Sequence, residues 1–328
     1  METLSIGHGA GGRLTEELVS LILGRFPGNP VADREDCAVL PGGIAVTIDG
    51  YTVTPLAFEG GDIGSLCICG SANDLSVRGA KPLYIALGVI VEEGFPFEDL
   101  ARFMTSAGEV CRALGIELVT GDTKVVPRGQ ADGLFLTTCA IGKTGAHPGL
   151  GTRNISPGDV ILLTSPPGMH GATIAASRYG LKVNGLSSDC AALWPMLETL
   201  LPLEGLKCMR DCTRGGLGTV LCEWAESAKV GIEIDETLIP WDEASISVCD
   251  LLGLDPLHMA GEGCAAVVVS PEEAEAALEL AKNHPLGKRA SIIGSVTEEH
   301  PGYVGIHTAS GGTRLVDKPV GEELPRIC

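Results

Sequence analysis

Apolar residues along the first half of the chain alternate between helical spacing and strand spacing. In segment 15–26, Leu18, Leu21 and Ile22 recur at the spacing of one helix face. Segment 82–93 is an uninterrupted apolar run, which is typical of a strand buried on both faces. A run of small residues predicts a helix over 63–79, apolar residues on one face predict another over 98–115, and strands are expected over 42–49, 116–123 and 131–142. This alternation is typical of a layered α/β or α+β domain.

A stretch rich in glycine, proline and polar residues, 143–159, interrupts this alternation. We expect a domain boundary there, between residues 148 and 149. Beyond it the patterns predict helices over 170–180, 216–228 and 271–283 and strands over 160–166, 231–234, 264–270 and 289–296. After residue 308 the apolar pattern fades. The sequence therefore predicts an α+β fold of two domains, 1–148 and 149–308, followed by a flexible tail, 309–328.

Composition and charge limit what the chain can bind. Its 328 residues, 45% of them apolar, are enough for two hydrophobic cores, and a formal net charge of −19 opposes broad nucleic-acid binding. An anionic nucleotide remains compatible with this charge if divalent cations bridge it to acidic side chains. We therefore expect no nucleic-acid partner.

Targeting and cysteine patterns place the protein in the cytoplasm. The first residues lack a basic region followed by an apolar one, and no run of about 18 apolar residues could span a bilayer. The twelve cysteines form neither CxxC pairs nor spaced Cys/His sets, so neither a zinc site nor a disulfide framework is indicated. We expect a cytoplasmic protein without membrane contact, in which most cysteines are small buried side chains.

Four aspartates of the first half stand at the edges of apolar segments. Converging carboxylates repel one another unless cations neutralise them, and Mg²⁺ bridging to phosphate is the common solution. Each residue could instead cap a helix or a turn, although this alternative weakens when four occur together. The four are Asp36, Asp49, Asp74 and Asp122.

Two further features of the first half could contact phosphate. The loop HGAGG offers backbone N–H groups that no side chain obstructs, although it matches neither a P-loop nor a dinucleotide-binding fingerprint. Lys124 could pair with phosphate or act as a base, or form a simple ion pair with Asp122. The candidate residues of the loop are His8, Gly9, Gly11 and Gly12.

The second half holds two more candidate groups. Asp211, Thr213 and Arg214 come just before a glycine pair that opens a predicted helix, which suits an anion or a simple helix cap. Glu262 lies between glycines before a predicted buried strand, where a carboxylate is costly unless it is functional or hydrogen-bonded. A turn role for Glu262 is the alternative.

The last residue is a cysteine, Cys328. It is not a prenylation signal, because that motif places its cysteine four residues from the end. A terminal thiol is expected to be exposed and sterically accessible, which suits a carrier nucleophile. From position alone we would interpret the residue as incidental.

Taken together, these segments resemble the HypE family of hydrogenase maturation factors. That family stands within a superfamily that includes aminoimidazole ribonucleotide synthetase, thiamine-phosphate kinase and selenophosphate synthetase. The resemblance runs nearly the whole length, and its most specific segments are the central block and the ending. It rests on HGAGGRL, PLAFEGGDIGSLCICGSANDLSVRGAKPLYIALGVIVEEGFP, VTGDTKVVPRGQADGLF, RDCTRGGLG and the terminal PRIC.

The resemblance implies an activity, partners and an assembly. Cys328 would receive a carbamoyl group from the carbamoyltransferase HypF. ATP would phosphorylate the carbamoyl oxygen, and loss of phosphate would leave a thiocyanate on the cysteine. The cyanide would then reach the iron of a nickel–iron hydrogenase through the HypC–HypD complex. The resemblance further implies a homodimer in which N-terminal sheets pair into a barrel, with ATP near the interface.

The resemblance also assigns roles to the candidate residues. Lys124 and Glu262 are candidates for charge stabilisation and proton removal, in an order left open, and His8 is the next candidate base. The HGAGG loop and the segment around Asp211, Thr213 and Arg214 would contact the nucleotide. Mg²⁺ and the triphosphate would be held by Asp36, Asp49, Asp74 and Asp122.

Two other hypotheses remain open from the sequence. The chain could be another ATP-dependent kinase or synthetase of the same superfamily, for which Cys328 would be irrelevant. It could also be a carrier without catalytic activity that shuttles a carbamoyl thiol. ADP release by the isolated protein opposes the carrier, and dependence of that release on carbamoylated Cys328 opposes the kinase.

Overall fold

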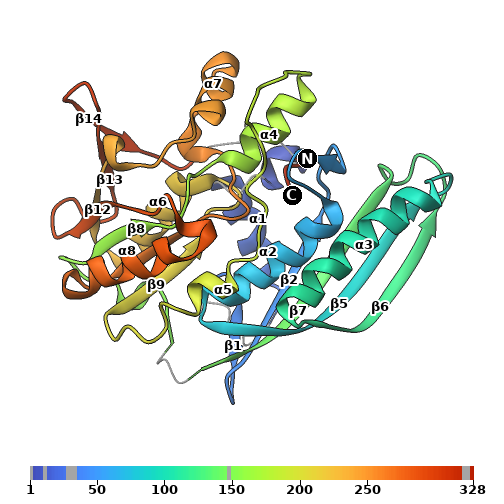
Figure 1. Cartoon of the computed structure of the whole chain (residues 1–328), viewed down its shortest axis with the longest axis horizontal. Helices are drawn as coiled ribbons and strands as arrows, with labels where there is room; N and C mark the ends of the chain where they lie inside the picture. The colour runs from blue at the N-terminus through green and yellow to red at the C-terminus, as the bar shows by residue number, and fades with distance from the viewer. Residues whose placement is uncertain (1–2, 10–12, 27–34, 146–148, 320–325) are drawn as a thin grey trace.

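The computed structural model describes residues 3–9, 13–26, 35–145, 149–319 and 326–328. Two sheets lie side by side, each with its own helices, and helix α2 (Ile63–Val77) lies between them (Figure 1). The N-terminal sheet is at the right of the view and the C-terminal sheet at the left. The predicted α+β fold of two sheet-and-helix domains is confirmed.

Five strands of the described chain form the N-terminal sheet, in the order β1-β2-β7-β5-β6. β5 and β6 are parallel, and the other neighbours are antiparallel. Two helices, α2 and α3 (Phe97–Leu114), cover one face of this sheet (Figure 1). The strands are β1 (Ala38–Leu40), β2 (Ile44–Tyr51), β5 (Ala80–Glu92), β6 (Glu117–Val126) and β7 (Leu134–Thr144).

Helix α2 is buried on nearly all sides, which its sequence of small and apolar residues permits. Its start is set by Asp62, whose carboxylate accepts hydrogen bonds from the backbone N–H groups of Gly64 and Ser65. The Ser65 hydroxyl accepts one from the Asp62 N–H in return, which completes a capping box. A fixed start for this central helix fixes the position of Asp74 further along it.

The other face of the N-terminal sheet is exposed. Ile48, Tyr84 and Ile90 are all more than one third exposed, and nearly every residue of β6 is exposed. The prediction that segment 82–93 is buried on both faces was therefore wrong for the single chain. Helices cover only one side of β5, and its other side is apolar surface.

Seven strands of the described chain form the C-terminal sheet, in the order β14-β13-β10-β12-β8-β11-β9. Helix α6 (Gly216–Ala228) packs on one face around the buried Trp224, and α5 (Trp194–Leu197) and α8 (Ala274–Asn283) lie on the other. The strands are β8 (Val160–Leu163), β9 (Leu206–Asp211), β10 (Gly231–Asp235), β11 (Ala265–Val269), β12 (Ser291–Thr297), β13 (Val304–His307) and β14 (Thr313–Val316).

The remaining elements are short or peripheral. Helix α1 (Arg13–Leu23) begins two residues before its predicted start, and α4 (Met169–Arg178) and α7 (Glu243–Leu252) lie near each other at the top of Figure 1. Two short strands, β3 (Ala57–Phe58) and β4 (Gly61–Asp62), form a hairpin. Short 3-10 helices are η1 (Ile6–Gly9), η3 (Thr152–Asn154), η4 (Glu236–Leu238), η5 (Pro256–His258), η6 (Pro271–Glu273) and η7 (Pro285–Gly287).

The segment after residue 308 differs from the expected irregular tail. Thr313–Val316 forms β14, which pairs with β13 and buries Val316 in the core. Residues 326–328 lie against the N-terminal domain and α4, where the C label stands in Figure 1. A strand of four residues with one buried side chain is too short to leave an apolar pattern.

No helix in the described ranges is both long and apolar enough to cross a membrane. All twelve cysteines lie in those ranges and none forms a disulfide. Eight of them are buried, which confirms that most serve as small core side chains.

Candidate acidic site between the domains

Three carboxylates from both domains meet at one point. Asp36 precedes β1, Asp74 lies on α2, and Asp211 ends β9. One oxygen of each lies within 4.8 Å of the others, and in the described part of the chain no other group of acidic, His or Cys side chains is spaced for a shared cation. The interface of the two domains therefore carries the candidate site.

Neighbouring side chains hold two of these carboxylates in place. Arg210 Nε donates to Asp36 Oδ1 at 3.0 Å, and its Nη1 lies 2.7 Å from Glu223. Thr47 Oγ1 donates to Asp74 Oδ2 at 2.7 Å. Sequence reasoning missed Arg210 and Thr47. Both could have been found from their sequence neighbours. Arg210 directly precedes Asp211, and Thr47 lies two residues before Asp49 and so on the same face of β2.

The third carboxylate has no such partner. Both oxygens of the buried Asp211, and Asp36 Oδ2, lack a hydrogen-bond partner among the described residues. A buried carboxylate that stays unpaired is costly, so each such group calls for an explanation. The orphaned oxygens belong to carboxylates of one cluster, which is the arrangement that a bound cation would satisfy.

Burial and mutual repulsion dominate the electrostatics of the cluster. Burial raises the pKa of Asp74 well above its ordinary value, and the charges of Asp49 and Asp211 raise it further. Burial also raises the pKa of Asp211 well above its ordinary value, and the Asp36 charge raises it further. For Asp36, burial raises the pKa although the Arg210 charge opposes it. A divalent cation would reverse this trend, because it favours the ionised carboxylates.

Asp49 lies beside the cluster on β2. Its Oδ2 accepts a hydrogen bond from Ser71 Oγ at 3.0 Å and is 3.5 Å from the Tyr51 hydroxyl. Ser71 in turn contacts Thr138 Oγ1 of β7. Hydroxyl groups on α2 and two strands therefore orient this carboxylate, so it lines the site without belonging to the group of three.

Glu262 is buried on the C-terminal side of the same site. Its backbone is held by Asn73, whose Nδ2 donates to the Glu262 carbonyl at 3.2 Å, and by Asp189, whose Oδ1 accepts from the Glu262 N–H at 3.1 Å. Burial raises the pKa of its carboxyl well above the ordinary value, and Cys190 and Asp211 add to the shift. A carboxylate with a raised pKa is a stronger base than an exposed one.

Asp122 and Lys124 lie elsewhere in the single chain. Lys124 Nζ bonds Asp122 Oδ2 at 2.5 Å on the exposed strand β6. Strand pairing connects Asp49 through Thr138 and Leu87 to Gly121, which is three strand spacings, or about 14 Å. The chain therefore does not join Asp122 to Asp36 and Asp74, contrary to the predicted four-aspartate set, because β6 is the far edge of the sheet.

The N-terminal loop approaches the second domain. His8 is in η1, where its Nδ1 lies 2.9 Å from Ser5 Oγ, and the Gly9 carbonyl accepts a hydrogen bond from Arg214 Nη1 at 3.3 Å. Thr213 and Arg214 precede α6, as predicted, and the Thr213 carbonyl accepts from the Gly216 N–H. Gly11 and Gly12 lie outside the described residues.

The carrier candidate Cys328 is half-buried, not fully exposed as the sequence suggested. Its carbonyl oxygen accepts a hydrogen bond from the Thr52 N–H at 2.9 Å, and Ile327 is buried beside it. Thr52 follows β2 three residues after Asp49, a separation of about 10 Å. The last residues therefore lie near the end of β2 that also carries the acidic site.

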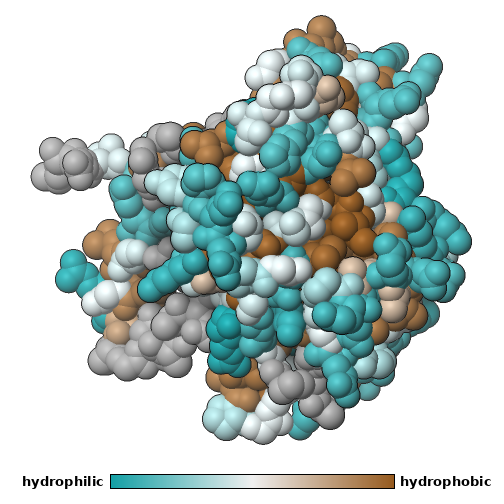
Figure 2. Space-filling model, turned by 90° about the vertical axis from the view of Figure 1, so that its left-hand side faces the viewer, coloured by the Kyte–Doolittle hydropathy of each residue, from teal (hydrophilic) through white to brown (hydrophobic). Residues whose placement is uncertain are grey.

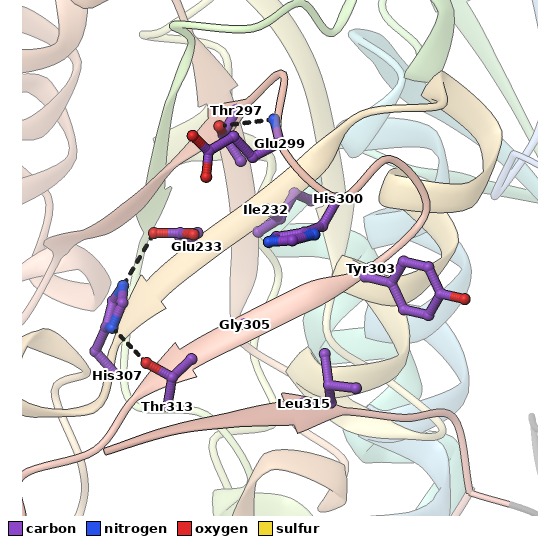
Figure 3. A pocket seen from close by; sticks show the side chains of 10 residues that line it. All are labelled: Ile232, Glu233, Thr297, Glu299, His300, Tyr303, Gly305, His307, Thr313 and Leu315. Atoms are coloured by element: carbon purple, nitrogen blue, oxygen red, sulfur yellow. Dashed lines mark hydrogen bonds and ion pairs between the residues drawn. The ribbon is translucent and has the colours of Figure 1, made fainter. Parts of the chain in front are cut away.

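A separate pocket of about 520 Å³ opens on the C-terminal sheet (Figure 3). It lies over β10, β13 and β14, and a Glu233–His307–Thr313 chain of hydrogen bonds closes one end. Figure 2 shows the side of the molecule that carries these strands, which is mostly hydrophilic, with its broadest apolar patch to the right of the middle. The pocket contains none of the predicted site residues.

Comparison with known proteins places the chain in a family. Residues 34–144 match the family described as AIR synthase related protein, N-terminal domain, and residues 156–307 match its C-terminal domain. Carbamoyl dehydratase HypE of Escherichia coli strain K12 is 42% identical over 340 residues, with 100% of both chains covered.

Two solved structures are similar over the whole chain. A HypE–HypF complex contains a chain with 42% identity and a TM-score of 0.89, and the match covers 94% of this chain and 100% of that one. HypE in complex with ATP gives 40% identity and a TM-score of 0.85, with 99% and 100% covered. The chain therefore belongs to the HypE family of hydrogenase maturation proteins.

Proposed function

We propose that this chain is an ATP-dependent carbamoyl dehydratase that converts an S-carbamoyl group on its own Cys328 into a thiocyanate. The single observation that carries the proposal is the position of Cys328, whose carbonyl oxygen is bound to the N–H of Thr52, three residues beyond Asp49. The chain thus brings its terminal cysteine toward its own acidic site. Relatives named carbamoyl dehydratase support the same reaction.

ATP is the proposed phosphoryl donor, and a HypE relative has been solved in complex with it. Asp36, Asp74 and Asp211 would hold Mg²⁺, with Asp49 beside them, because orphaned carboxylate oxygens suit a hard cation. Mg²⁺ would supply charge neutralisation for the triphosphate. Arg214 and the N-terminal loop residues His8, Gly9, Gly11 and Gly12 would contact the phosphates.

The first proposed step activates the carbamoyl group. Its oxygen attacks the γ-phosphorus of ATP, ADP leaves, and one N–H proton is lost, which gives an O-phosphorylated thioimidate on Cys328. This step replaces oxide, a poor leaving group, by phosphate. The negatively charged residues of the site repel a free phosphate anion and so favour its later release.

The second proposed step forms the cyanide. A base removes the remaining N–H proton, the C–O bond breaks, and phosphate leaves with its electron pair, so that S–C≡N remains on Cys328. Glu262 is the proposed base, since its carboxyl is buried with a raised pKa. Lys124 is proposed to stabilise the departing phosphate.

A homodimer would bring Lys124 to the site. Among the described residues β6 is an edge strand, and the outward face of its sheet exposes Ile48, Tyr84 and Ile90. Exposed strand edges and apolar sheet faces favour pairing with another chain. We propose that two copies pair these sheets into a barrel, so that Asp122 and Lys124 of one copy reach the acidic site of the other.

Two partners are proposed, one that delivers the carbamoyl group and one that accepts the cyanide. A HypE relative forms a complex with HypF, and we propose that HypF delivers the carbamoyl group to Cys328 here. The HypC–HypD complex is proposed to accept the cyanide for the iron of a nickel–iron hydrogenase. We propose that the reaction takes place in the cytoplasm, a reducing compartment that twelve free cysteines suit.

ADP release tests the proposal against its two alternatives. The isolated chain and the S-carbamoylated chain are each mixed with Mg²⁺–ATP, and ADP is followed over time. We expect about one ADP per carbamoylated Cys328 and little without carbamoylation. Equal release from both forms would favour a small-molecule kinase, and no release from either would favour a carrier without catalytic activity.

A further inference from the structure

The last three residues of the chain occupy a defined seat, which consists of Thr52, Thr54, His170 and Arg178. Each carbonyl of the segment is bound by a different part of it. The Thr52 N–H donates to the Cys328 carbonyl at 2.9 Å, and the Thr54 N–H donates to the Arg326 carbonyl at 3.2 Å. His170 Nε2 lies 2.7 Å from the Ile327 carbonyl between them. The seat thus contacts the main chain of the segment.

The Arg178 side chain of the seat and the Ile327 side chain of the segment add to this main-chain contact. Arg178 Nε donates to the Thr54 carbonyl at 2.6 Å, and its guanidinium also donates to the Arg326 carbonyl. Ile327 is 6% exposed and belongs to the same hydrophobic cluster as Val53. In such a contact the main-chain hydrogen bonds supply affinity, and the buried side chain makes the contact specific for this segment.

The hydrogen bonds of His170 define which of its nitrogens carries the proton. A carbonyl oxygen can only accept, so Nε2 must donate to Ile327. Nδ1 then accepts from Ser188 Oγ at 2.8 Å, and Ser188 Oγ in turn accepts from the Cys190 N–H at 3.1 Å. The ring is fully buried and meets Phe58 edge-on, with centroids 5.0 Å apart. One neutral tautomer, in one orientation, therefore faces the tail.

We propose that His170 is a positioning residue that holds the C-terminal segment in its seat, and that Ser188 fixes the tautomer that His170 needs for this role. The role in catalysis rests on the proposed dehydration at Cys328, whereas the holding itself does not. The seat binds the segment through main-chain carbonyl oxygens, which the thiol, the carbamoyl and the cyano form of Cys328 all share.

Hydrogen exchange at the Thr52 and Thr54 amides tests the holding directly, because the tail carbonyls accept from both. The full chain is compared with His170→Leu, which removes the donor, His170→Gln, whose amide can donate at a similar reach, and His307→Leu as a matched control in the separate pocket. We expect about tenfold faster exchange at both amides in His170→Leu, and rates within about twofold of wild type in the other two.

Amides within β2, such as those of Ala45 and Thr47, report on the fold in the same experiment. If they accelerate as much as Thr52 and Thr54 in both His170 variants, His170 is only a core residue and the proposal is overturned. Unchanged Thr52 and Thr54 exchange in His170→Leu would also overturn it.

Two reaction rates then test positioning for chemistry. We expect His170→Leu to accept the carbamoyl group at least as fast as wild type and to dehydrate it about tenfold more slowly, with His170→Gln in between. Equal slowing of both steps, or faster exchange with unchanged dehydration, would overturn the positioning role. Failure of wild type to dehydrate at all would instead overturn the proposed function, while the exchange result would still stand for the seat.

Discussion

The Thr52 backbone N–H donates to the Cys328 carbonyl oxygen at 2.9 Å, although 276 residues separate the two in the chain. Thr52 follows the strand that carries Asp49, so this one bond ties the last residue to the strand that lines the acidic site. A thiol held at a fixed main-chain position can meet its reaction partner without a bimolecular search.

Asp211→Asn should weaken Mg²⁺–ATP binding by about tenfold or more, because it removes a charged oxygen ligand from the cluster. The same change should stabilise the metal-free fold by about 1 kcal/mol, since both Asp211 oxygens lack partners and repel Asp36 and Asp74. Calorimetric titration and thermal unfolding with and without Mg²⁺ measure the two effects.

Asp159→Asn is the matched control for that experiment. Asp159 is also buried, but its carboxylate accepts from the Ser156 N–H and lies outside the cluster. The Asp159→Asn variant should have a lower free energy of unfolding than wild type and an unchanged affinity for Mg²⁺–ATP. Unchanged affinity in Asp211→Asn as well would return the cluster to a structural role.

Glu262→Gln and Lys124→Ala should each slow dehydration by at least about tenfold while changing ATP affinity less, because both act on charge that moves in the reaction. Each variant should accumulate carbamoylated Cys328 in a single-turnover assay. If both convert carbamoyl to cyano at the wild-type rate, the base must be sought elsewhere, with His8 the next candidate.

Mixing these two slowed variants tests whether one site is built from two copies. In our proposal each site combines Lys124 of one copy with Glu262 of the other. A dimer of one Glu262→Gln copy and one Lys124→Ala copy would therefore contain one site with both native residues. Random exchange of copies should restore about a quarter of wild-type activity. No recovery after verified exchange would show that both residues act within one chain.

His170 should make stability depend on pH in the acid range. Burial lowers the pKa of His170 to about 4, the Arg178 charge adds to the shift, and an exposed His titrates near 6.5. As the pH falls from about 6.5 to about 4, the unfolded chain takes up a proton that the folded chain does not. The free energy of unfolding should then decrease by up to about 3 kcal/mol.

The comparison of wild type with His170→Gln isolates this effect, because the raised pKa values of the buried aspartates affect both proteins alike. Denaturant unfolding at several pH values should show a difference that changes with pH in the stated direction. Parallel curves for the two proteins would contradict a neutral, buried His170.

The sequence predicted most long elements because their apolar spacing is set by burial against helices. Helix α3 and strand β5 were found from their apolar residues, whereas β14 was missed because only Val316 of its four residues is buried. The apolar outward face of β5 led to the wrong prediction that this strand is buried on both faces. The sequence does not distinguish an apolar face covered by a helix from one left on the surface.

The site was predictable in part for a similar reason. Carboxylates at element ends could be recognised in the sequence, but which of them meet depends on how two domains pack. Asp211 joins Asp36 and Asp74 across the domain interface, while Asp122 lies on the far edge strand. His170 was predicted only as part of a helix, because its partner Ile327 is 157 residues away.

The mass of the C-terminal peptide tests the central claim most directly. The chain is incubated with HypF, carbamoyl phosphate and Mg²⁺–ATP, and the peptide ending in Cys328 is followed beside that of Cys328→Ala. We predict a carbamoyl adduct that then loses the mass of one water only when ATP is present, and no adduct in the variant, which should still fold and bind ATP. A carbamoyl adduct that persists with ATP, or a cyano product in Cys328→Ala, would contradict the account.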